Sequence, residues 1–242
     1  MDSLMKIRKA GGGELMSGIK IGTLNEQPLH SALKNYYAGD SGEKEVRVDG
    51  YIIDVVNNCE FYEIQTGNFS TIKRKVSQIT PKHRLTVVYP IAVEKWIVKL
   101  PEKTRGEVKR RKSPKKEGVY QLFKELVSFP DYINHQNFFI DVVKIQEEEL
   151  RKYTGEKTWR QNGWVTLERR LLNVLEIQRF SDRQSFYCLL PEALPKAFTT
   201  KDLANLVQIP RWLAQKAVYC LRKMHAVKII SKKGRANLYQ RS

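Results

Sequence analysis

Two carboxylates, Asp54 and Glu63, are the residues whose type and spacing most clearly suggest chemistry. They lie in two β-type segments on either side of residues 57–60, and a hairpin turn there would pair Val56 with Phe61. Asp54 then lies opposite Glu63, and like charges so placed destabilise a sheet unless a cation neutralises them. Mg²⁺ takes oxygen ligands and keeps several waters. The spacing therefore predicts a divalent-cation site at the rim of a sheet.

The neighbours of these carboxylates follow from strand geometry. On a strand, Gln65 points to the same face as Glu63, while Ile64 points to the core. Asp49 is an alternative first acid, although an unbroken strand would turn it away from Asp54. A purely structural interpretation also stays open, in which Asp54 is a hairpin-edge residue and Glu63 a surface residue.

Other catalytic motifs are absent from the sequence. The four histidines show no HxxxH or Cys/His spacing, no serine lies in GxSxG, and there is no Walker loop. We interpret His30 as a packed or exposed histidine rather than a ligand, and His83 as a loop residue.

The elements that must position the carboxylates follow from periodicity. Asn25 is a good N-cap for a helix that should end near Gly39. Further along, the sequence predicts a helix over residues 69–79 and strands over 45–56 (with a break at Gly50 allowed), 61–66, 84–89 and 94–100. This order fits neither the alternation of a Rossmann domain nor an all-β fold.

An Asp on one strand and Glu-x-Lys on the next, flanked by helices, marks the PD-(D/E)XK nucleases. Residues 18–102 resemble that superfamily, and the segments GTLNE, VDGYIIDVV and EIQTGNFS resemble an uncharacterised prokaryotic group of such proteins. The resemblance implies an α+β fold with an αβββαβ-type core and a mixed sheet. It also implies that Asp54 and Glu63 bind Mg²⁺ (or Mn²⁺) with help from the Ile64 carbonyl. Gln65 would orient the attacking water, and Glu26 on the first helix could complete the metal shell.

Gln65 departs from the family pattern, because it stands where the lysine usually does. A lysine supplies positive charge, whereas a glutamine only forms hydrogen bonds. Some restriction enzymes of this superfamily work with Glu-x-Gln. Lys73 or Lys75, on the following helix, could supply the missing cation.

The composition points to a polyanionic partner. The 242 residues include 43 Lys or Arg and 26 Asp or Glu, giving a net charge of +17, which is typical of nucleic-acid binding. No run of 18 apolar residues suggests a membrane span. Three widely separated cysteines fit a reduced, cytoplasmic protein without a disulfide framework.

The charge divides the chain into five predicted parts. Residues 1–17 form a flexible arm, 18–102 the nuclease-like core, 103–118 a basic connector, 119–194 an α/β connecting region and 195–242 a basic C-terminal domain. Lys103 to Lys116 hold eight basic residues against one acid, a pattern of a solvated linker or a phosphate-binding arm. In the connecting region we expect a helix over 119–127 and strands over 138–145 and 171–180.

The C-terminal part resembles a winged helix-turn-helix. A capping box, Thr199 to Asp202, opens a first helix, a second follows Pro210, and a basic hairpin closes the chain. The last 47 residues carry 11 basic residues and one acid, a net charge of +10. The second helix would enter the major groove, and the hairpin tip would meet phosphate or the minor groove. The expected DNA contacts are Arg211, Gln215, Lys216, Tyr219, Arg222, Lys232, Lys233 and Arg235.

The sequence thus predicts a metal-dependent endonuclease that binds nucleic acid, foremost double-stranded DNA, and no membrane. Two alternatives stay open: a DNA-binding regulator with an inactive nuclease-like core, and an RNA-directed nuclease. A homodimer is among the oligomeric states we consider.

Overall fold

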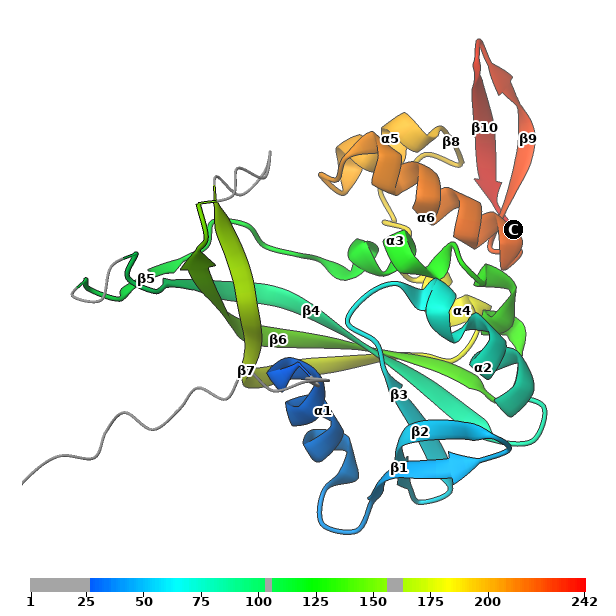
Figure 1. Cartoon of the computed structure of the whole chain (residues 1–242). Helices are drawn as coiled ribbons and strands as arrows, with labels where there is room; N and C mark the ends of the chain where they lie inside the picture. The colour runs from blue at the N-terminus through cyan, green and yellow to red at the C-terminus, as the bar shows by residue number, and fades with distance from the viewer. Residues whose placement is uncertain (1–26, 103–105, 156–162) are drawn as a thin grey trace, which may run out of the picture.

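The computed structural model describes residues 27–102, 106–155 and 163–242 as a mixed α+β fold. The predicted arm over residues 1–17 and the metal-shell residue Glu26 lie outside these ranges. The predicted N-cap Asn25 is wrong, because the first helix, Pro28–Ala38, has Gln27 as its N-cap. The larger sheet runs in the order β1-β2-β3-β4-β6-β7, with β5 paired to β4 (Figure 1). Its strands are β1 (Glu43–Val48), β2 (Tyr51–Asn57), β3 (Glu60–Ile64), β4 (Arg84–Lys99), β5 (Lys109–Lys112), β6 (Phe138–Tyr153) and β7 (Trp164–Phe180).

The segment predicted as a strand over residues 45–56 is broken at Gly50, as the prediction allowed, and the chain reverses fully there into a hairpin. Asp49 and Gly50 both have positive φ, 50° and 82°, and they form the turn of the β1–β2 hairpin. Asp-Gly is a favoured pair for such turns, since the tight hairpin turn that matches strand twist needs left-handed backbone at both central residues. Asp49 is therefore a turn residue at the hairpin tip and not part of a strand with Asp54.

The second hairpin has the predicted register. Val56 pairs with Phe61, which confirms the turn expected over residues 57–60. β3 then runs parallel to β4, β4 parallel to β6, and β6 antiparallel to β7, so the sheet is mixed. The element order from α1 (Pro28–Ala38) through β1, β2, β3 and α2 (Lys73–Ile79) to β4 brings both carboxylate-bearing strands beside the sheet centre.

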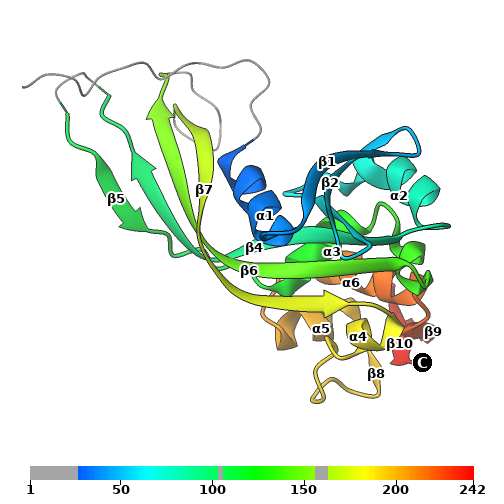
Figure 2. The same ribbon diagram turned by 90° about the horizontal axis from the view of Figure 1, so that it is seen from below.

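β4, β6 and β7 are far longer than predicted. The two strands expected over 84–89 and 94–100 are one continuous strand, in which Pro90 keeps its register opposite Val143. The outer halves of these strands, together with β5, extend beyond the helices as a projection that we call the β-arm, residues 93–99, 109–112, 146–153 and 164–172 (Figures 1 and 2). Part of the predicted connector is thus a paired strand.

Helices cover both faces of the inner sheet. α1 covers one face, where Leu29 and Leu33 pack with Ile64, Val88 and Val143. The other face carries α2, α3 (Leu122–Leu126), α4 (Arg183–Tyr187), α5 (Thr200–Leu206) and α6 (Arg211–Lys223) over a larger buried cluster.

That larger cluster crosses residue 195, where we expected a domain boundary. Phe123 and Phe186, before the boundary, belong to the same buried cluster as Leu213 and Ala217 of α6. Removing residues 195–242 would expose this surface to water, at a cost of about 25 cal/mol per Å² of apolar area. Point variants are therefore the sound way to test the C-terminal segment.

The C-terminal segment holds a second sheet, of β8 (Ala197–Phe198), β10 (Ala236–Arg241) and β9 (Val227–Lys233), in that order. The predicted capping box is confirmed, since Thr199 and Asp202 cap α5 reciprocally. α5 and α6 follow one another, and the β9–β10 hairpin projects from the end of α6 (Figure 1). Across the described ranges, no helix has the length and apolar content to cross a membrane.

Candidate functional site

The predicted acidic site lies where β2 and β3 separate. The main-chain ladder between these strands ends at Val55 and Tyr62. Beyond it, the Ile64 N–H donates to the Asp54 carboxylate, with N and Oδ2 2.8 Å apart, instead of to a β2 carbonyl. β3 stays paired to β4 here, so one strand holds the site firmly while the other leaves room for a side chain.

Two residues of α1 contact Asp54. Lys34 Nζ lies 3.2 Å from Asp54 Oδ1, and His30 Nε2 lies 3.4 Å from Asp54 Oδ2 and 3.1 Å from the Ile64 carbonyl oxygen. They lie four residues apart on the helix, which places them on one face. His30, interpreted from the sequence as merely packed or exposed, thus lies against both the carboxylate and the carbonyl of the site.

The ion-pair partner of Glu63 is a lysine of α2. Lys75 Nζ lies 2.6 Å from Glu63 Oε1 and donates to the Ile52 carbonyl at 2.8 Å. Gln65 Nε2 is 3.4 Å from the same Glu63 oxygen. Glu63 is only 3% exposed, and its other oxygen, Oε2, has no hydrogen-bond partner among the described residues. A buried carboxylate oxygen without a partner carries a desolvation cost that a bound cation would offset.

The two carboxylates differ in their pKa. Burial raises the pKa of Glu63, and the nearby charge of Asp54 raises it further, while Lys75 opposes this only in part. Burial also acts to raise the pKa of Asp54, but the hydrogen bonds from His30 and the Ile64 N–H and the charge of Lys34 lower it overall. Asp54 is therefore the more persistent anion, and Glu63 is the one that takes up a proton first.

The donors present fit a small hard cation. Asp54 and Glu63 offer carboxylate oxygens, and the Ile64 carbonyl oxygen shares the His30 contact with Asp54. Within the described ranges no three His, Cys, Asp or Glu side chains form a metal-binding group. Mg²⁺ is commonly held by one or two carboxylates with several waters, so this oxygen set suffices without a third side chain. Lys34 and Lys75 balance the negative charge of Asp54 and Glu63, which a bound cation would also neutralise.

Two of the predicted auxiliary residues lie away from this site. Asp49 pairs with Lys82 at the tip of the β1–β2 hairpin, with Oδ2 and Nζ 3.2 Å apart. Lys73 is exposed at the start of α2 and forms no ion pair with any residue that the structure describes. Lys75 is thus the one of the two lysines that reaches the carboxylates.

A cavity opens on the α1 side of the site. It has a volume of about 350 Å³ and is lined by Gln27, His30, Lys34, Glu45 and Thr66. Two residues of its lining, His30 and Lys34, also contact Asp54, which does not itself line the cavity.

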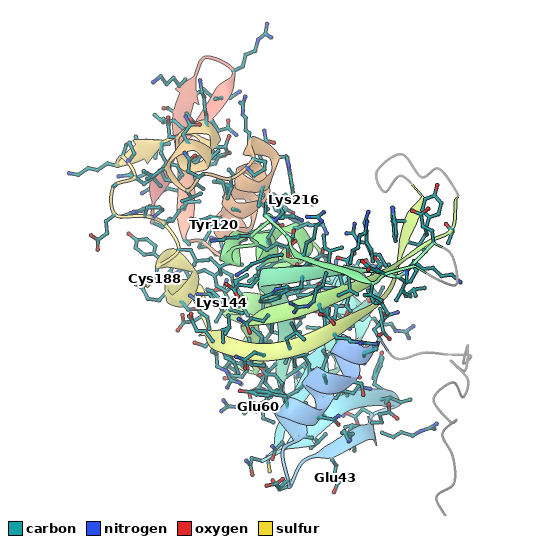
Figure 3. All side chains as sticks on the ribbon, turned by 90° about the vertical axis from the view of Figure 1, so that its left-hand side faces the viewer. Glu43, Glu60, Tyr120, Lys144, Cys188 and Lys216 are labelled. Atoms are coloured by element: carbon teal, nitrogen blue, oxygen red, sulfur yellow. The ribbon has the colours of Figure 1, made fainter. Side chains whose placement is uncertain are left out.

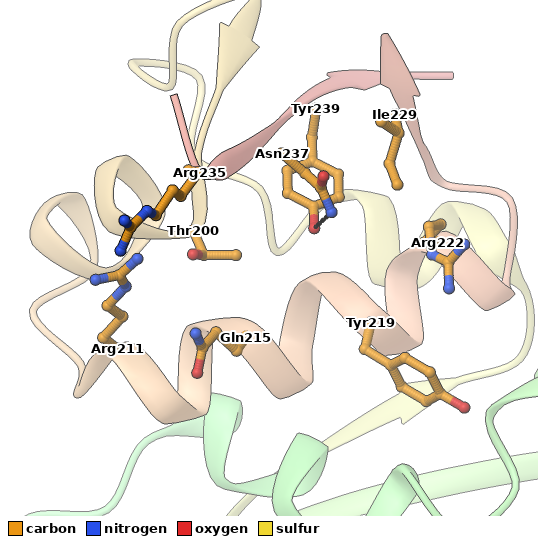
Figure 4. Close-up of a pocket in the computed structure, with 10 residues that line it drawn as sticks. Thr200, Arg211, Gln215, Tyr219, Arg222, Ile229, Arg235, Asn237 and Tyr239 are labelled. Atoms are coloured by element: carbon orange, nitrogen blue, oxygen red, sulfur yellow. Dashed lines mark hydrogen bonds between the residues drawn. The ribbon is translucent and has the colours of Figure 1, made fainter. Parts of the chain in front are cut away.

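A second candidate site lies between α6 and the β9–β10 hairpin. This groove has a volume of about 430 Å³, and no acidic residue is among the described residues that line it (Figure 4). Five of the predicted DNA contacts line it, namely Arg211, Gln215, Tyr219, Arg222 and Arg235. The sequence reading missed Thr200, Asn237 and Tyr239, which lie on α5 and the hairpin and also line it.

The other three predicted contacts do not line the groove. Lys216 Nζ lies 3.3 Å from the Lys124 carbonyl oxygen, at the junction of α6 with the preceding part of the fold (Figure 3). Lys232 and Lys233 are exposed on β9. Lys216 was assigned to the outer face of its helix because the contact with α3 is not visible in the sequence.

Comparisons with known proteins match the part of the chain that contains the acidic site. Residues 27–181, more than half of the chain, match the family described as Domain of unknown function (DUF8091). An uncharacterised protein of Treponema pallidum (strain Nichols) is 30% identical over 185 residues, which cover 76% of this chain and 73% of that protein. No solved structure matches the chain.

Proposed function

The chain belongs to the family described as Domain of unknown function (DUF8091), and we propose that it is a metal-dependent nuclease that hydrolyses phosphodiester bonds in double-stranded DNA. One observation carries this proposal. Asp54 and the Glu63-Ile64-Gln65 segment meet where β2 and β3 separate, and Lys75 enters from α2 beside Glu63. The site thus has the two carboxylates and the cation of the PD-(D/E)XK pattern, with the lysine supplied by another element.

Each residue has a role that its contacts support. Asp54, Glu63 and the Ile64 carbonyl would hold Mg²⁺ or Mn²⁺, which when bound would polarise a phosphoryl oxygen and lower the pKa of a water. Lys75 keeps a positive charge 2.6 Å from Glu63 Oε1, where it can stabilise negative charge on the reacting phosphate. Gln65 lies on the same side as Glu63 and can position a water by hydrogen bonding.

Two α1 residues complete the site. His30 fixes the orientation of Asp54 and the Ile64 carbonyl, since its Nε2 lies within 3.4 Å of both oxygens. Lys34 is buried against Asp54 and also pairs with Glu45 at 3.0 Å. Lys34 would therefore keep Glu45 as an ion-pair partner if Asp54 bound a metal ion.

The C-terminal segment supplies the DNA contacts in this proposal. Its strand order and its two consecutive helices with a hairpin support a winged-helix arrangement. Among the residues that the structure describes, the groove beside α6 is lined by three arginines and by no acid. Arginines in such a groove bind phosphates and base edges, which fixes the position of a duplex.

A DNA-binding regulator with an inactive core is the second candidate. It is favoured by the ion pairs of Lys34 with Asp54 and of Lys75 with Glu63, which neutralise both carboxylates without a metal. In this case the same groove would bind DNA, and the acidic site would serve only to hold α1 and α2 against the sheet.

A cleavage assay separates the two. Plasmid DNA and a duplex RNA of the same sequence are incubated with the full chain in Mg²⁺, Mn²⁺ or EDTA. We expect metal-dependent cleavage of DNA by wild type and by Asp49→Asn, which removes an acid outside the site, and none by Asp54→Asn or Glu63→Gln. DNA binding by a wild type that cleaves neither substrate would support the regulator. Cleavage of RNA alone would establish an RNA-directed nuclease.

A further inference from the structure

The outer end of the β-arm carries a row of cations that neither candidate site uses. Lys99 of β4 lies directly opposite Lys109 of β5 on one side and Arg151 of β6 on the other. Neighbouring strands are about 4.8 Å apart, and partners in register point to the same face. Three like charges therefore lie side by side across three strands.

The same face of β4 shows how such charges are normally balanced. Lys95, four residues before Lys99, lies 3.0 Å from Glu147 Oε1 and 3.3 Å from Glu149 Oε2. Lys99 and Lys109, by contrast, have no carboxylate partner among the described residues, and Arg151 shares Glu149 with Lys95. Like charges at this spacing repel unless an anion lies over them.

Aromatic side chains lie next to this row. Lys99 Nζ is 4.0 Å from the centre of the Trp164 ring, and Trp164 contacts Tyr153 with ring centres 5.5 Å apart. Lys99, Lys109 and Trp164 also line a groove of about 480 Å³. Glu102 and Glu107 line this groove too and balance the charge of its two lysines, although neither glutamate forms an ion pair with Lys99 or Lys109.

The opposite face of β5 differs, although it has the same kinds of residue. Arg110 pairs with Glu148 at 2.8 Å, and Lys112 pairs with Glu94 at 2.8 Å. Both also lie over the Trp96 ring. The four basic residues of this strand thus alternate between the two faces of the sheet. Those on one face form ion pairs, and those on the other have no carboxylate partner in the part of the chain that the structure describes.

We propose that the row formed by Lys109, Lys99 and Arg151 binds the sugar-phosphate backbone of DNA outside both candidate sites. Aligned cations, two of which lack a carboxylate partner among the described residues, suit a run of phosphates, and neutralising the phosphates releases counterions from the DNA. The inference rests on the proposed function only in taking DNA as the ligand. It requires no cleavage.

The test measures binding without catalysis. Fluorescence anisotropy follows a labelled DNA duplex about three helical turns long, in EDTA, across a series of salt concentrations. The test variant is Lys99→Gln with Lys109→Gln in the full chain. Its control is Arg110→Gln with Lys112→Gln, which removes the same charge from the same arm. Melting temperatures show that both variants are folded.

We expect the test variant to bind about tenfold more weakly near 0.1 M salt. The slope of log K against log salt should become shallower by about 1.8, since each phosphate contact contributes about 0.9. The control should keep the wild-type slope. Equal losses in the two variants, or no loss in the test variant, would overturn the inference. The result is independent of the cleavage assay, because no metal is present.

Discussion

Lys75 of α2 donates to Glu63 of β3 across 2.6 Å, although the motif places its lysine two residues after the glutamate, where Gln65 stands. The same ammonium donates to the Ile52 carbonyl, so two contacts fix its position. Positive charge beside the site therefore depends on how α2 packs on the sheet and not on the strand that carries the acid.

Replacing Lys75 should abolish most of the proposed activity. We expect Lys75→Met to lower the rate of metal-dependent DNA cleavage about 10²- to 10³-fold, the usual effect of removing one group that stabilises transition-state charge. Lys73→Met, which removes an exposed lysine two residues away, should cleave at the wild-type rate. Single-turnover cleavage rates measure both.

A lysine returned to the motif position should restore that activity. Gln65→Lys in the Lys75→Met background places a cation on the same strand as Glu63, and we expect it to recover at least a tenth of the wild-type rate. Gln65→Ala alone should slow cleavage if Gln65 positions a water. Full activity of Lys75→Met would show that the ion pair with Glu63 is only structural.

Metal binding should be visible as stabilisation of the fold. At a Mn²⁺ concentration about 100 times its Kd, a ligand of the native state adds about 2.7 kcal/mol, which for a chain of this size corresponds to about 5–10 °C in Tm. Asp54→Asn should lose this shift, and Asp49→Asn should keep it. An equal shift in wild type and Asp54→Asn would place the metal elsewhere.

The buried charge of Glu63 should cost stability when no metal is present. Because folding raises its pKa, Glu63 favours the native state fully below its unfolded pKa, and this contribution is lost as pH rises through the folded pKa. Glu63→Gln carries no charge, so its metal-free Tm at pH 7 should exceed that of wild type by about 2–4 °C. The difference should disappear near pH 4.5. A lower Tm of Glu63→Gln at pH 7 would mean that the Lys75 ion pair outweighs burial.

The groove beside α6 should contribute more to DNA affinity than the rest of that helix. Arg222→Ala removes a groove arginine and should weaken duplex binding by about 1–3 kcal/mol if it contacts a base edge. Lys216→Ala removes an equal charge from the side of α6 that meets Lys124, and its effect should be several-fold smaller. Anisotropy titrations at one salt concentration make the comparison.

An ion network should stabilise the β-arm above acidic pH. Burial acts to raise the pKa of Glu149, but hydrogen bonds from Arg151 and Thr166 and the charge of Lys95 lower it to about 2. Glu149 therefore adds stability above its unfolded pKa, which is lost as pH falls toward 2. Glu149→Gln should lower Tm at pH 7 by about 2–6 °C, and the loss should shrink between about pH 4.5 and pH 2.

Local patterns predicted the parts of this fold that depend on neighbouring residues. The turn between β2 and β3 has left-handed backbone at Asn58 and Cys59, and the Asn57-Asn58 pair signals it in the sequence, so the pairing of Val56 with Phe61 could be predicted. The Thr199 capping box is equally local. The Asp49-Gly50 hairpin carried an equally strong signal, a turn pair between residues that favour strands. The break at Gly50 was allowed for, but the full reversal of the chain was not predicted, because the segments on each side read as one strand.

Contacts between distant elements were not predictable in the same way. Nothing in the helical periodicity of α1 indicates that His30 and Lys34 meet Asp54, because that contact depends on how α1 crosses the sheet. The length of β4 was missed for a related reason. Pro90 lacks an N–H and reads as a strand break, yet the strand continues through it with paired neighbours on both sides.

Because β4 is one continuous strand, it sets the distance between the acidic site and the outer end of the β-arm. Near one end Val87 pairs with Glu63 of the acidic site, and at the other end Lys99 is flanked by Lys109 and Arg151. A strand advances about 3.3 Å per residue, so these two points lie up to about 40 Å apart, close to the 34–36 Å of one turn of B-DNA. A duplex held at both points would present the same side of its helix to each. The β-arm should therefore protect the DNA backbone about one helical turn away from the phosphate that is cleaved. The protected stretch should shift whenever the cleavage position shifts.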